Sequence, residues 1–355
     1  MTVEIPDSLV TAQLRYNGDL GRAFLAALPE RAATFLRRWR LTRDGPVAAG
    51  VCALVLPVRR SDGTPAVLKL QYLDDETVGE PVALRAWDGR GAARLLAHDP
   101  GTGTMLLERL DASRQLGTVA DSRAAVLVIA GLLARLTAVR APSGLRDLGT
   151  MVRATVPRTP AVRTVEDPGA RRVLEGCTAA LRELVADADA ETDTDTGAGA
   201  RARADGSVAG NADVDGHAEA DGHTEADRHT EADVGGDVEA DAGAGAGGGF
   251  GNRLLHWDLH FENVLAGGRE PWLAIDPKPL SGDPGFELFP ALHNRFAASE
   301  VVWRFDAMTD VLGLDRERAR AWTLVRVLQF CLWDAEQHRL PGAVQVEVGR
   351  RLLDR

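Results

Sequence analysis

The amino-acid sequence predicts an α+β fold in two parts, a small antiparallel sheet with one helix followed by a larger, mainly helical region. After a helical segment at 21–40, the rest of residues 1–110 has short β-type runs with one helix inserted among them, whereas helical periodicity dominates residues 111–355. Within the second part, residues 187–250 consist mostly of Ala, Gly, Asp, Glu and Thr, with almost no large apolar side chain. Such a segment cannot bury enough apolar surface to order itself, so it is expected to be a disordered insertion.

Each element of the first part has a local signal. The spacing of apolar residues over 21–40 predicts an amphipathic helix that is interrupted near Pro29. Apolar and β-branched runs predict two strands on either side of the turn Ser-Asp-Gly-Thr-Pro. After the first helix, the expected elements are strands over 47–58 and 66–72, a helix over 77–88, and strands over 92–98 and 104–110.

The second part is expected to be built from helices. Asp121 is a suitable N-cap, because a carboxylate at this position accepts the unpaired N–H groups of the first helical turn. The expected helices cover residues 122–139, 169–186, 317–338 and 342–354.

The charge of the chain is concentrated in the insertion. The 355 residues carry a formal net charge of −11 at pH 7. Residues 187–249 contain 17 acidic residues and three arginines, so the rest of the chain carries a net charge of +3. A folded part so close to neutrality is not expected to present a nucleic-acid-binding face.

The composition predicts a cytoplasmic protein without a membrane span. The longest apolar run, between Arg123 and Arg135, holds 11 residues, which is too short to cross a bilayer. The N-terminus shows no basic patch followed by an apolar run, so no signal peptide is expected. Three cysteines stand far apart and without metal-ligand spacing, which indicates buried thiols in a reducing compartment.

The residues with chemical potential are concentrated in the segment 254–288. His256-x-Asp258 follows an apolar run, and Asn263 stands five residues after Asp258. A second strand, from Trp272 to Ile275, ends directly before Asp276.

These residue types are the ones that phosphoryl transfer from ATP requires. A carboxylate must orient the attacking hydroxyl and accept its proton, and Asp258 suits that role. Mg²⁺ prefers oxygen ligands, which Asn263 and Asp276 can supply. A cation must contact the phosphates, and Lys69 in the strand of the first part is suitable.

Lysine usage supports the choice of Lys69. Of 41 basic residues, only Lys69 and Lys278 are lysines, so this chain has Arg at nearly every basic position. A lysine that is retained against such a bias indicates a position where a compact ammonium is needed and a planar guanidinium does not fit. Lys69 also needs a carboxylate partner, for which Glu80 is favoured and Glu76 is the competing candidate.

The motif His-x-Asp-x4-Asn, followed by a strand that ends in Asp, resembles the catalytic and metal-binding loops of the protein-kinase superfamily. The fuller form HxDLHxxNVL…IDPK…GDP is similar to the aminoglycoside phosphotransferases, and among them to the streptomycin 6-kinase and hydroxyurea kinase group. The resemblance covers nearly the whole chain except the acidic insertion. It implies a two-lobed protein-kinase-like fold, with an N-lobe (1–110), a C-lobe (111–355) and ATP between them.

The resemblance also implies roles for individual residues. It makes Asp258 the catalytic base and assigns ATP and Mg²⁺ as cofactors. Asn263 and Asp276 are implied to bind magnesium, and Lys69, held by Glu80, to contact the α- and β-phosphates. The hinge 106–110, which includes Glu108 and Leu110, is implied to bind adenine through its backbone. Asp283 is implied to brace the catalytic loop.

Several positions depart from the family pattern or stay open. Trp257 stands where these kinases often have a small residue, and the expected phosphate-covering loop holds one glycine, Gly50. His256 and His260 are expected to brace the catalytic loop, and for His260 a contact with a phosphate stays open as the alternative. Lys278 is expected either to approach the γ-phosphate or to brace the loop.

Acceptor-binding residues are expected among the C-terminal helices. A stripe along the helix 317–338 shares one face, and this face either contacts a substrate or is a half-buried outer surface. The stripe consists of Trp322, Arg326, Gln329, Trp333 and Glu336, and Glu287, Trp303, Asp306 and Asp310 are further candidates.

The short segment after Asp276 favours a small acceptor. Only six residues separate Asp276 from Asp283, which leaves little room for the peptide-docking segment of protein kinases. The sequence therefore predicts an ATP-dependent O-phosphotransferase acting on a small molecule, an aminoglycoside-type antibiotic or hydroxyurea, without an obligate protein partner. Two alternatives stay open, a kinase of another small metabolite and a nucleotide-binding pseudokinase. Deletion of residues 190–246 is expected to preserve folding and ATP binding.

Overall fold

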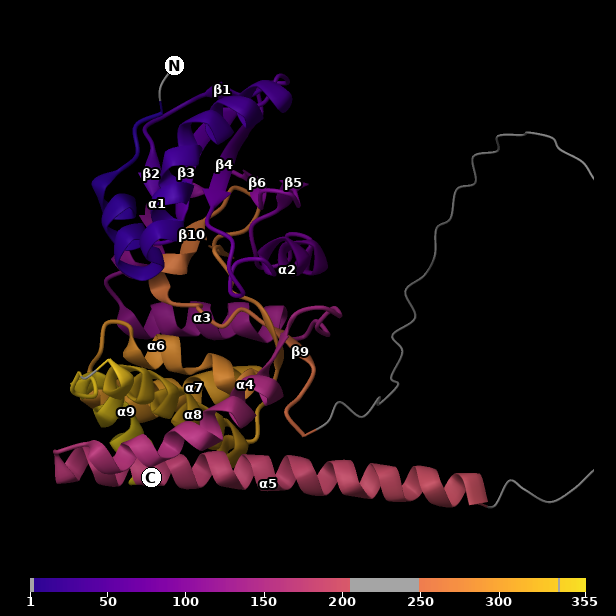
Figure 1. Ribbon diagram of the computed structural model, residues 1–355, viewed down its shortest axis with the longest axis vertical. Coiled ribbons are helices and arrows are strands. Elements are labelled where there is room, and N and C mark those ends of the chain that lie inside the picture. The colour runs from indigo at the N-terminus through magenta and orange to yellow at the C-terminus, as the bar shows by residue number, and fades with distance from the viewer. Residues whose placement is uncertain (1–2, 205–248, 338) are drawn as a thin grey trace, which may run out of the picture.

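The computed structural model describes residues 3–204, 249–337 and 339–355. It confirms the predicted two-lobed α+β fold, with an antiparallel sheet and helix α1 above a mainly helical body (Figure 1). The central part of the predicted insertion, residues 205–248, lies outside the described residues.

The N-lobe sheet has six antiparallel strands in the order β1-β3-β4-β6-β5, with β2 beside β3. The predicted strand over 47–58 is divided in two by a turn at 50–52. A helix between β4 and β5 is present as predicted. The elements are β1 Thr42–Arg43, β2 Ala48–Ala49, β3 Ala53–Arg59, β4 Pro65–Gln71, α2 Glu80–Trp87, β5 Leu95–Asp99 and β6 Thr104–Glu108.

Helix α1, Asp7–Arg38, packs on this sheet, and the prediction of a break near Pro29 is wrong. The break lies at Gly18, whose φ of 52° and ψ of −122° suit glycine rather than residues with a side chain. The chain turns so tightly here that a Cβ on Gly21 would lie 2.3 Å from the backbone oxygen of Gln13. The helix continues through Pro29 because the buried Leu28 packs this part of the helix against the sheet. This packing outweighs the one backbone hydrogen bond that proline cannot make.

The C-lobe contains the predicted helices and some that were not predicted. Asp121 caps α3 as expected, since its side chain accepts the N–H groups of Arg123 and Ala124. The unpredicted helices are α4, α6 and α7. The helices are α3 Ser122–Leu136, α4 Leu148–Thr155, α5 Pro168–Ala204, α6 Phe289–His293, α7 Val301–Leu312, α8 Arg316–Glu336 and α9 Ala343–Leu353.

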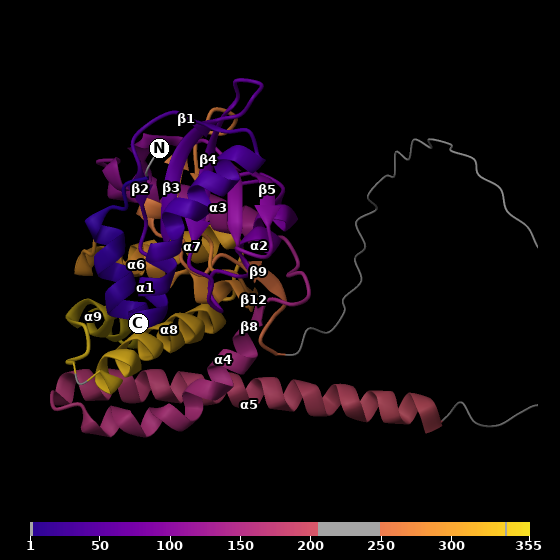
Figure 2. The ribbon, with the colours of Figure 1, turned by 45° about the horizontal axis from the view of Figure 1, so that its top comes forward.

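Both boundaries predicted for the insertion need correction. Helix α5 does not end at residue 186 but continues to Ala204 and projects beyond the rest of the lobe (Figure 2). Beyond residue 186, the buried Ala188 still packs on the core. At the other boundary, Phe250 is buried, and its ring lies 6.0 Å from that of Trp322.

Two small sheets hold the loops that carry the sequence motifs. One has the order β11-β10-β7 and the other the order β8-β12-β9. The catalytic loop connects β9 to β10, and the loop with Asp276 connects β11 to β12. The strands are β7 Asp111–Gln115, β8 Arg146–Asp147, β9 Arg253–Leu255, β10 Val264–Ala266, β11 Leu273–Ala274 and β12 Leu280–Gly282.

Helix α2 belongs to the N-lobe by sequence but packs into the core of the C-lobe. Ala83, Leu84 and Trp87 lie in the same hydrophobic cluster as the residues of α3 and α8. The Trp87 indole Nε1 also donates a hydrogen bond of 3.0 Å to the backbone oxygen of Leu136. The two lobes therefore share this helix, and the domain division at residue 110 stays a prediction.

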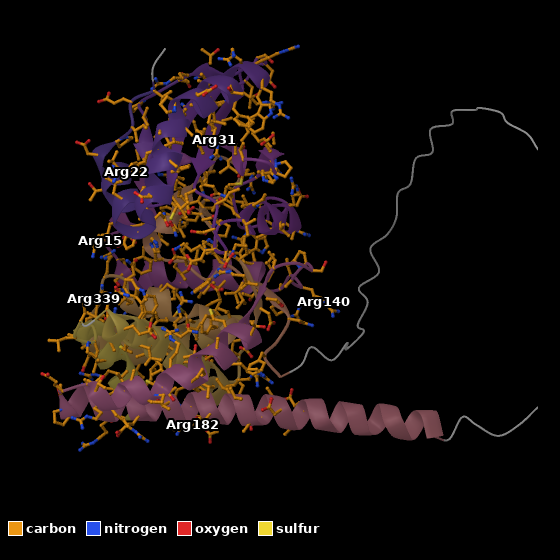
Figure 3. All side chains as sticks on the ribbon, in the orientation of Figure 1. Arg15, Arg22, Arg31, Arg140, Arg182 and Arg339 are labelled. Atoms are coloured by element: carbon orange, nitrogen blue, oxygen red, sulfur yellow. The ribbon has the colours of Figure 1, made fainter. Side chains whose placement is uncertain are left out.

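Arginine is spread over both lobes, in contrast to lysine. Figure 3 labels three arginines on α1 and three in the C-lobe, on widely separated parts of the molecule. They are Arg15, Arg22, Arg31, Arg140, Arg182 and Arg339. Among the helices that the structure describes, none combines the length and the hydropathy that a membrane crossing requires.

Candidate active site

The two lysines of the chain lie in one cluster of charged side chains, to which β4, α2 and the two motif loops contribute. Lys69 Nζ on β4 lies 2.7 and 2.6 Å from the two carboxylate oxygens of Glu80 and 2.5 Å from Oδ1 of Asp276. Lys278 Nζ lies 3.2 Å from Glu76 and 3.7 Å from Oδ2 of Asp258. The predicted pairing of Lys69 with Glu80 is confirmed, and Glu76 pairs with Lys278 instead.

The cluster holds more carboxylates than ammonium groups. Burial opposes the charge of Lys69, but Asp276 and Glu80 outweigh it and hold the lysine pKa above its ordinary value. Burial, together with the nearby Asp276, raises the pKa of Glu80. Desolvation also opposes the charge of Asp276, but Lys69 and Lys278 outweigh it and lower the pKa of Asp276. Together, the carboxylates of Glu76, Glu80, Asp258 and Asp276 share two ammonium groups.

The catalytic loop places Asp258 beside Lys278 in this cluster. Trp257, the residue before Asp258, has a φ of 66°, which lies in the left-handed region of backbone conformation. The Asp258 side chain is 30% exposed. Asn263 Nδ2 donates to the backbone oxygen of Asp258 at 2.9 Å, which leaves the amide oxygen of Asn263 available. The backbone oxygen of Asn263 accepts the N–H of Ile275 at 2.9 Å, so Asn263 lies beside Asp276.

Asn263 and Asp276 fit the demands of a magnesium ion. They present one amide oxygen and one carboxylate, and Mg²⁺ usually keeps several waters and phosphate oxygens besides one or two protein carboxylates. Within the described ranges, no group of three or more His, Cys, Asp and Glu side chains forms a cage for a metal. The excess of carboxylates would repel bare phosphates, so a divalent cation is needed to bring ATP here.

His256 braces the loop, as the sequence predicts. Its ring is fully buried and lies 6.0 Å from Trp87, nearly parallel to it. Nδ1 accepts the N–H of Asp258 at 3.3 Å, and Nε2, which then carries the proton, donates to the backbone oxygen of Ile275 at 3.1 Å. Burial lowers the pKa of His256 to about 4, so the ring is neutral at pH 7 and links both motif loops.

A second brace comes from residues to which the sequence gave other roles. Glu287, a predicted acceptor-binding residue, is fully buried, and its Oε1 accepts the N–H of Trp257 at 2.7 Å. Arg326 on α8 donates to the backbone oxygen of Trp257 at 3.1 Å. Asp283, which was expected to hold this loop, instead accepts the N–H of Gly285 and pairs with Arg318 at 2.6 Å.

Trp257 itself is fixed between two arginines. The guanidinium of Arg146 lies 4.2 Å from the centre of a Trp257 ring, and that of Arg326 lies 4.7 Å away. Arg146 also donates to the backbone oxygen of Lys278 at 3.1 Å, which connects the tryptophan to the second lysine. The bulky residue that departs from the family pattern therefore joins the catalytic loop to the loop that carries Lys278.

The residues predicted to contact the nucleotide lie in the N-lobe and in its connection to the C-lobe. Gly50 lies in a tight turn in which its N–H donates to the oxygen of Ala53 at 3.0 Å, and Gln13 holds the turn through the oxygen of Val51. Glu108 ends β6 and uses its carboxylate to pair with Arg269 at 2.7 Å. Leu110 lies in the short connection to β7, so the predicted hinge joins the N-lobe sheet to the sheet of the catalytic loop.

A cavity of about 250 Å³ adjoins Asp258 on the C-lobe side. His260 lines it and pairs through Nδ1 with Glu262 at 2.9 Å. Two aromatic residues of its wall, Phe289 and Phe330, were not predicted, although Phe330 lies one helical turn after Arg326 and this spacing is visible in the sequence. The lining residues are Asp258, His260, Glu262, Phe289, Pro290, His293, Asn294, Arg326, Phe330 and Gln345.

Five predicted acceptor residues do not line this cavity, because each is engaged elsewhere by an arginine. Trp303 lies under Arg123 at 4.6 Å, and Trp333 lies under Arg339 at 4.3 Å. Glu336 pairs with Arg158 at 2.6 Å, Asp306 pairs with Arg316 at 3.7 Å, and Asp310 also pairs with Arg316.

Comparison with known proteins identifies the relatives of this chain. It matches the aminoglycoside/hydroxyurea antibiotic resistance kinase family over residues 38–197 and 217–337. A hydroxyurea phosphotransferase of Kitasatospora aureofaciens is 52% identical over 337 residues, which cover 94% of this chain and 81% of that protein. A streptomycin 6-kinase of Streptomyces glaucescens is 44% identical over 343 residues, with coverage of 94% and 92%.

Solved structures show the same fold at much lower identity. A choline/ethanolamine kinase family protein from Mesorhizobium loti matches with a TM-score of 0.50 and 16% identity, covering 95% of this chain and 92% of that one. A macrolide 2′-phosphotransferase from Brachybacterium faecium matches with a TM-score of 0.50 and 14% identity, covering 92% and 97%. These structures share the fold of the chain, whereas its family follows from the family match and the close relatives. The chain therefore belongs to the aminoglycoside/hydroxyurea antibiotic resistance kinase family.

Proposed function

We propose that the chain transfers the γ-phosphoryl group of ATP to a hydroxyl group of a small molecule, either hydroxyurea or an aminoglycoside-type antibiotic. The observation that carries the proposal is the position of Asp258, which lies 3.7 Å from the ammonium of Lys278 and lines the 250 Å³ cavity. Lys69, Glu80 and Asp276 are in contact with one another, and Asp276 belongs to the same loop as Lys278. The names of the close relatives support both acceptors.

The reaction joins the acceptor oxygen to the γ-phosphorus and breaks the bond between that phosphorus and the oxygen bridging it to the β-phosphate. ADP leaves, and Asp258 takes the proton of the attacking hydroxyl. Asp258 also orients this hydroxyl, because its backbone is held by His256 and Asn263.

Other residues stabilise charge on the phosphates. Lys69 is placed to contact the α- and β-phosphates, and Lys278 to contact the γ-phosphate or to fix Asp258. Magnesium, held by Asn263 and Asp276, would neutralise negative charge on the β- and γ-phosphate oxygens. All three cysteines of the chain are unpaired, which supports a cytoplasmic location for this reaction.

The test is acceptor-dependent ADP release with ATP and Mg²⁺, measured with hydroxyurea, streptomycin, other aminoglycosides and a peptide mixture. We expect turnover with at least one small molecule, and a fall in kcat of about 10²- to 10⁴-fold for Asp258→Asn. The ATP dissociation constant should stay unchanged in this variant. Asp310→Asn, which alters an exposed carboxylate on α7, is the matched control. Transfer to peptides alone, or full activity of Asp258→Asn, would contradict the proposal.

A further inference from the structure

We propose that Arg326 binds an oxygen atom of the acceptor next to the reactive hydroxyl, and that the cavity beside Asp258 is built for small neutral N-hydroxy carbonyl compounds. Hydroxyurea belongs to this class, whereas polycationic aminoglycosides do not. The inference rests on the proposed function and selects one of its two acceptor classes.

Arg326 is a buried cation with unused hydrogen-bonding capacity. Its side chain lines the cavity and is only 4% exposed. Nη2 donates to the backbone oxygen of Trp257, whereas Nε and Nη1 are buried and have no hydrogen-bond partner among the described residues. Such unsatisfied donors are rare in proteins and unfavourable unless a ligand or water completes them.

The surroundings of Arg326 hold its guanidinium in place through aromatic rings, and no carboxylate in the described ranges is hydrogen-bonded to it. Ring centres of Trp257, Phe286 and Phe330 lie 4.7, 4.9 and 5.2 Å from the guanidinium carbon. Across the part of the chain that the structure describes, no carboxylate lies within ion-pair distance of Arg326; Glu287 binds the N–H of Trp257 with one oxygen, and its other oxygen has no hydrogen-bond partner. Burial lowers the pKa of Arg326 to about 9, although Glu287 and Asp258 act in the opposite direction, so the group stays charged at pH 7.

The rest of the cavity is poorly suited to a polycation. Of the two carboxylates in its lining, Glu262 is already bound to His260 and Asn294 at 2.9 Å each, which leaves Asp258 alone. A volume of about 250 Å³ is also below the roughly 300–1,000 Å³ typical of sites for drug-sized ligands.

The chemistry of an N-hydroxy carbonyl compound matches this arrangement. In O=C–N–OH, the carbonyl oxygen and the reactive hydroxyl are separated by one carbon and one nitrogen. The hydroxyl belongs at Asp258, where its proton is taken, and the carbonyl oxygen accepts a hydrogen bond from the guanidinium. A buried charged donor also rejects an analogue that lacks the matching oxygen, because the donor is then left unpaired.

The experiment compares hydroxyurea with hydroxylamine, which keeps the N-hydroxy group and lacks the carbonyl, in wild type and in Arg326→Met. We expect Arg326→Met to lower kcat/KM for hydroxyurea by about 10- to 100-fold, as for a lost hydrogen bond to a charged group. The value for hydroxylamine and the KM for ATP should change by less than about threefold. Equal losses with both acceptors would mean that Arg326 acts only by positioning Trp257, and would overturn the proposal.

Two further measurements keep the result interpretable. Calorimetric titration of hydroxyurea should show weaker binding to Arg326→Met and intermediate binding to Arg326→Lys; equal binding to all three proteins would overturn the proposal even without turnover. Arg316→Met, at an exposed position of the same helix, is the matched control for folding and activity. A wild type that phosphorylates only streptomycin would overturn this inference and leave the proposed function standing, whereas a wild type that phosphorylates no small molecule would overturn the proposed function.

Discussion

At the scale of single residues, each lysine holds its ammonium between two carboxylates. This geometry offers a reason why the chain retains lysine at these two positions, and the reason can be tested. Lys69 is 7% exposed and lies between Glu80 and Asp276. We expect Lys69→Arg to lower kcat/KM for ATP about 100-fold, because the wider guanidinium cannot take the same position between both carboxylates and the phosphates. Steady-state kinetics with ATP varied give this ratio.

The control for Lys69→Arg is the reverse exchange at a surface. Arg59 on β3 is 49% exposed and pairs with Asp44, so Arg59→Lys should leave the kinetic constants unchanged. Wild-type activity in Lys69→Arg would show that the site needs only a positive charge, and the argument from lysine usage would then fail.

His256 predicts a specific dependence of stability on pH. Its folded pKa of about 4 lies below the ordinary value of 6.5, so the stabilisation is fully present above pH 6.5 and is lost as the pH falls through 4. The shift corresponds to about 3 kcal/mol of unfolding free energy. Urea unfolding at several pH values should show a smaller loss over this window in His256→Asn than in wild type. His260→Asn, on the exposed side of the loop, serves as control and should keep the wild-type slope.

The residues that the sequence predicts correctly are those whose partners follow from a short, regular spacing. Asn263 lies beside Asp276 because the two flank a hairpin of adjacent strands, and Lys69 meets Glu80 because a strand and the next helix hold them. Glu287 and Arg326 were assigned wrongly or incompletely, because their contact with Trp257 depends on how α8 packs on the loop. No local pattern encodes that long-range packing.

At the scale of elements, the break in α1 depends on the backbone of one glycine. Gly18 has a φ of 52° and open space around it, so an added Cβ meets no atom but strains the backbone. Gly18→Ala should therefore lower the unfolding free energy by about 1–2 kcal/mol. Gly131→Ala, in the interior of α3 and also with open space, should instead raise it by about 0.5–1 kcal/mol. Thermal or urea unfolding of both variants gives the sign, and stabilisation by Gly18→Ala would contradict the structure of the break.

Elements were predictable to the extent that they carry their own periodicity or cap. The helices α3 and α8 have both, since Asp121 and Asp315 cap them. Helix α7 begins at Val301, its N-cap residue Glu300 makes no side-chain capping hydrogen bond, and the sequence did not predict this helix. The strands of the two small sheets have two to five residues, too few to show an alternation, and they form only because the loops bring them together.

At the scale of the whole molecule, helix α2 couples the lobes. Its first residue, Glu80, holds Lys69 on the N-lobe sheet, and its last residue, Trp87, is buried against Leu136 and His256 of the C-lobe. The phosphate-binding lysine and the catalytic loop are thus fixed to one another through a single helix. This arrangement explains why residues more than 180 positions apart in the sequence keep a common geometry.

The acidic insertion supplies the net charge of the molecule without being needed for its core. Deletion of residues 192–246 removes all of the −11 net charge. The flanking chain is already in contact, since a Cβ on Gly249 would lie 2.5 Å from Cα of Ala188, so five residues suffice to join them. Because loop length changes stability only weakly, the shortened protein should keep its melting temperature and its ATP affinity. Its zero net charge should make it associate at low salt. Thermal melts, ATP titration and light scattering test this, and loss of folding or of ATP binding would show that the insertion is part of the structural core.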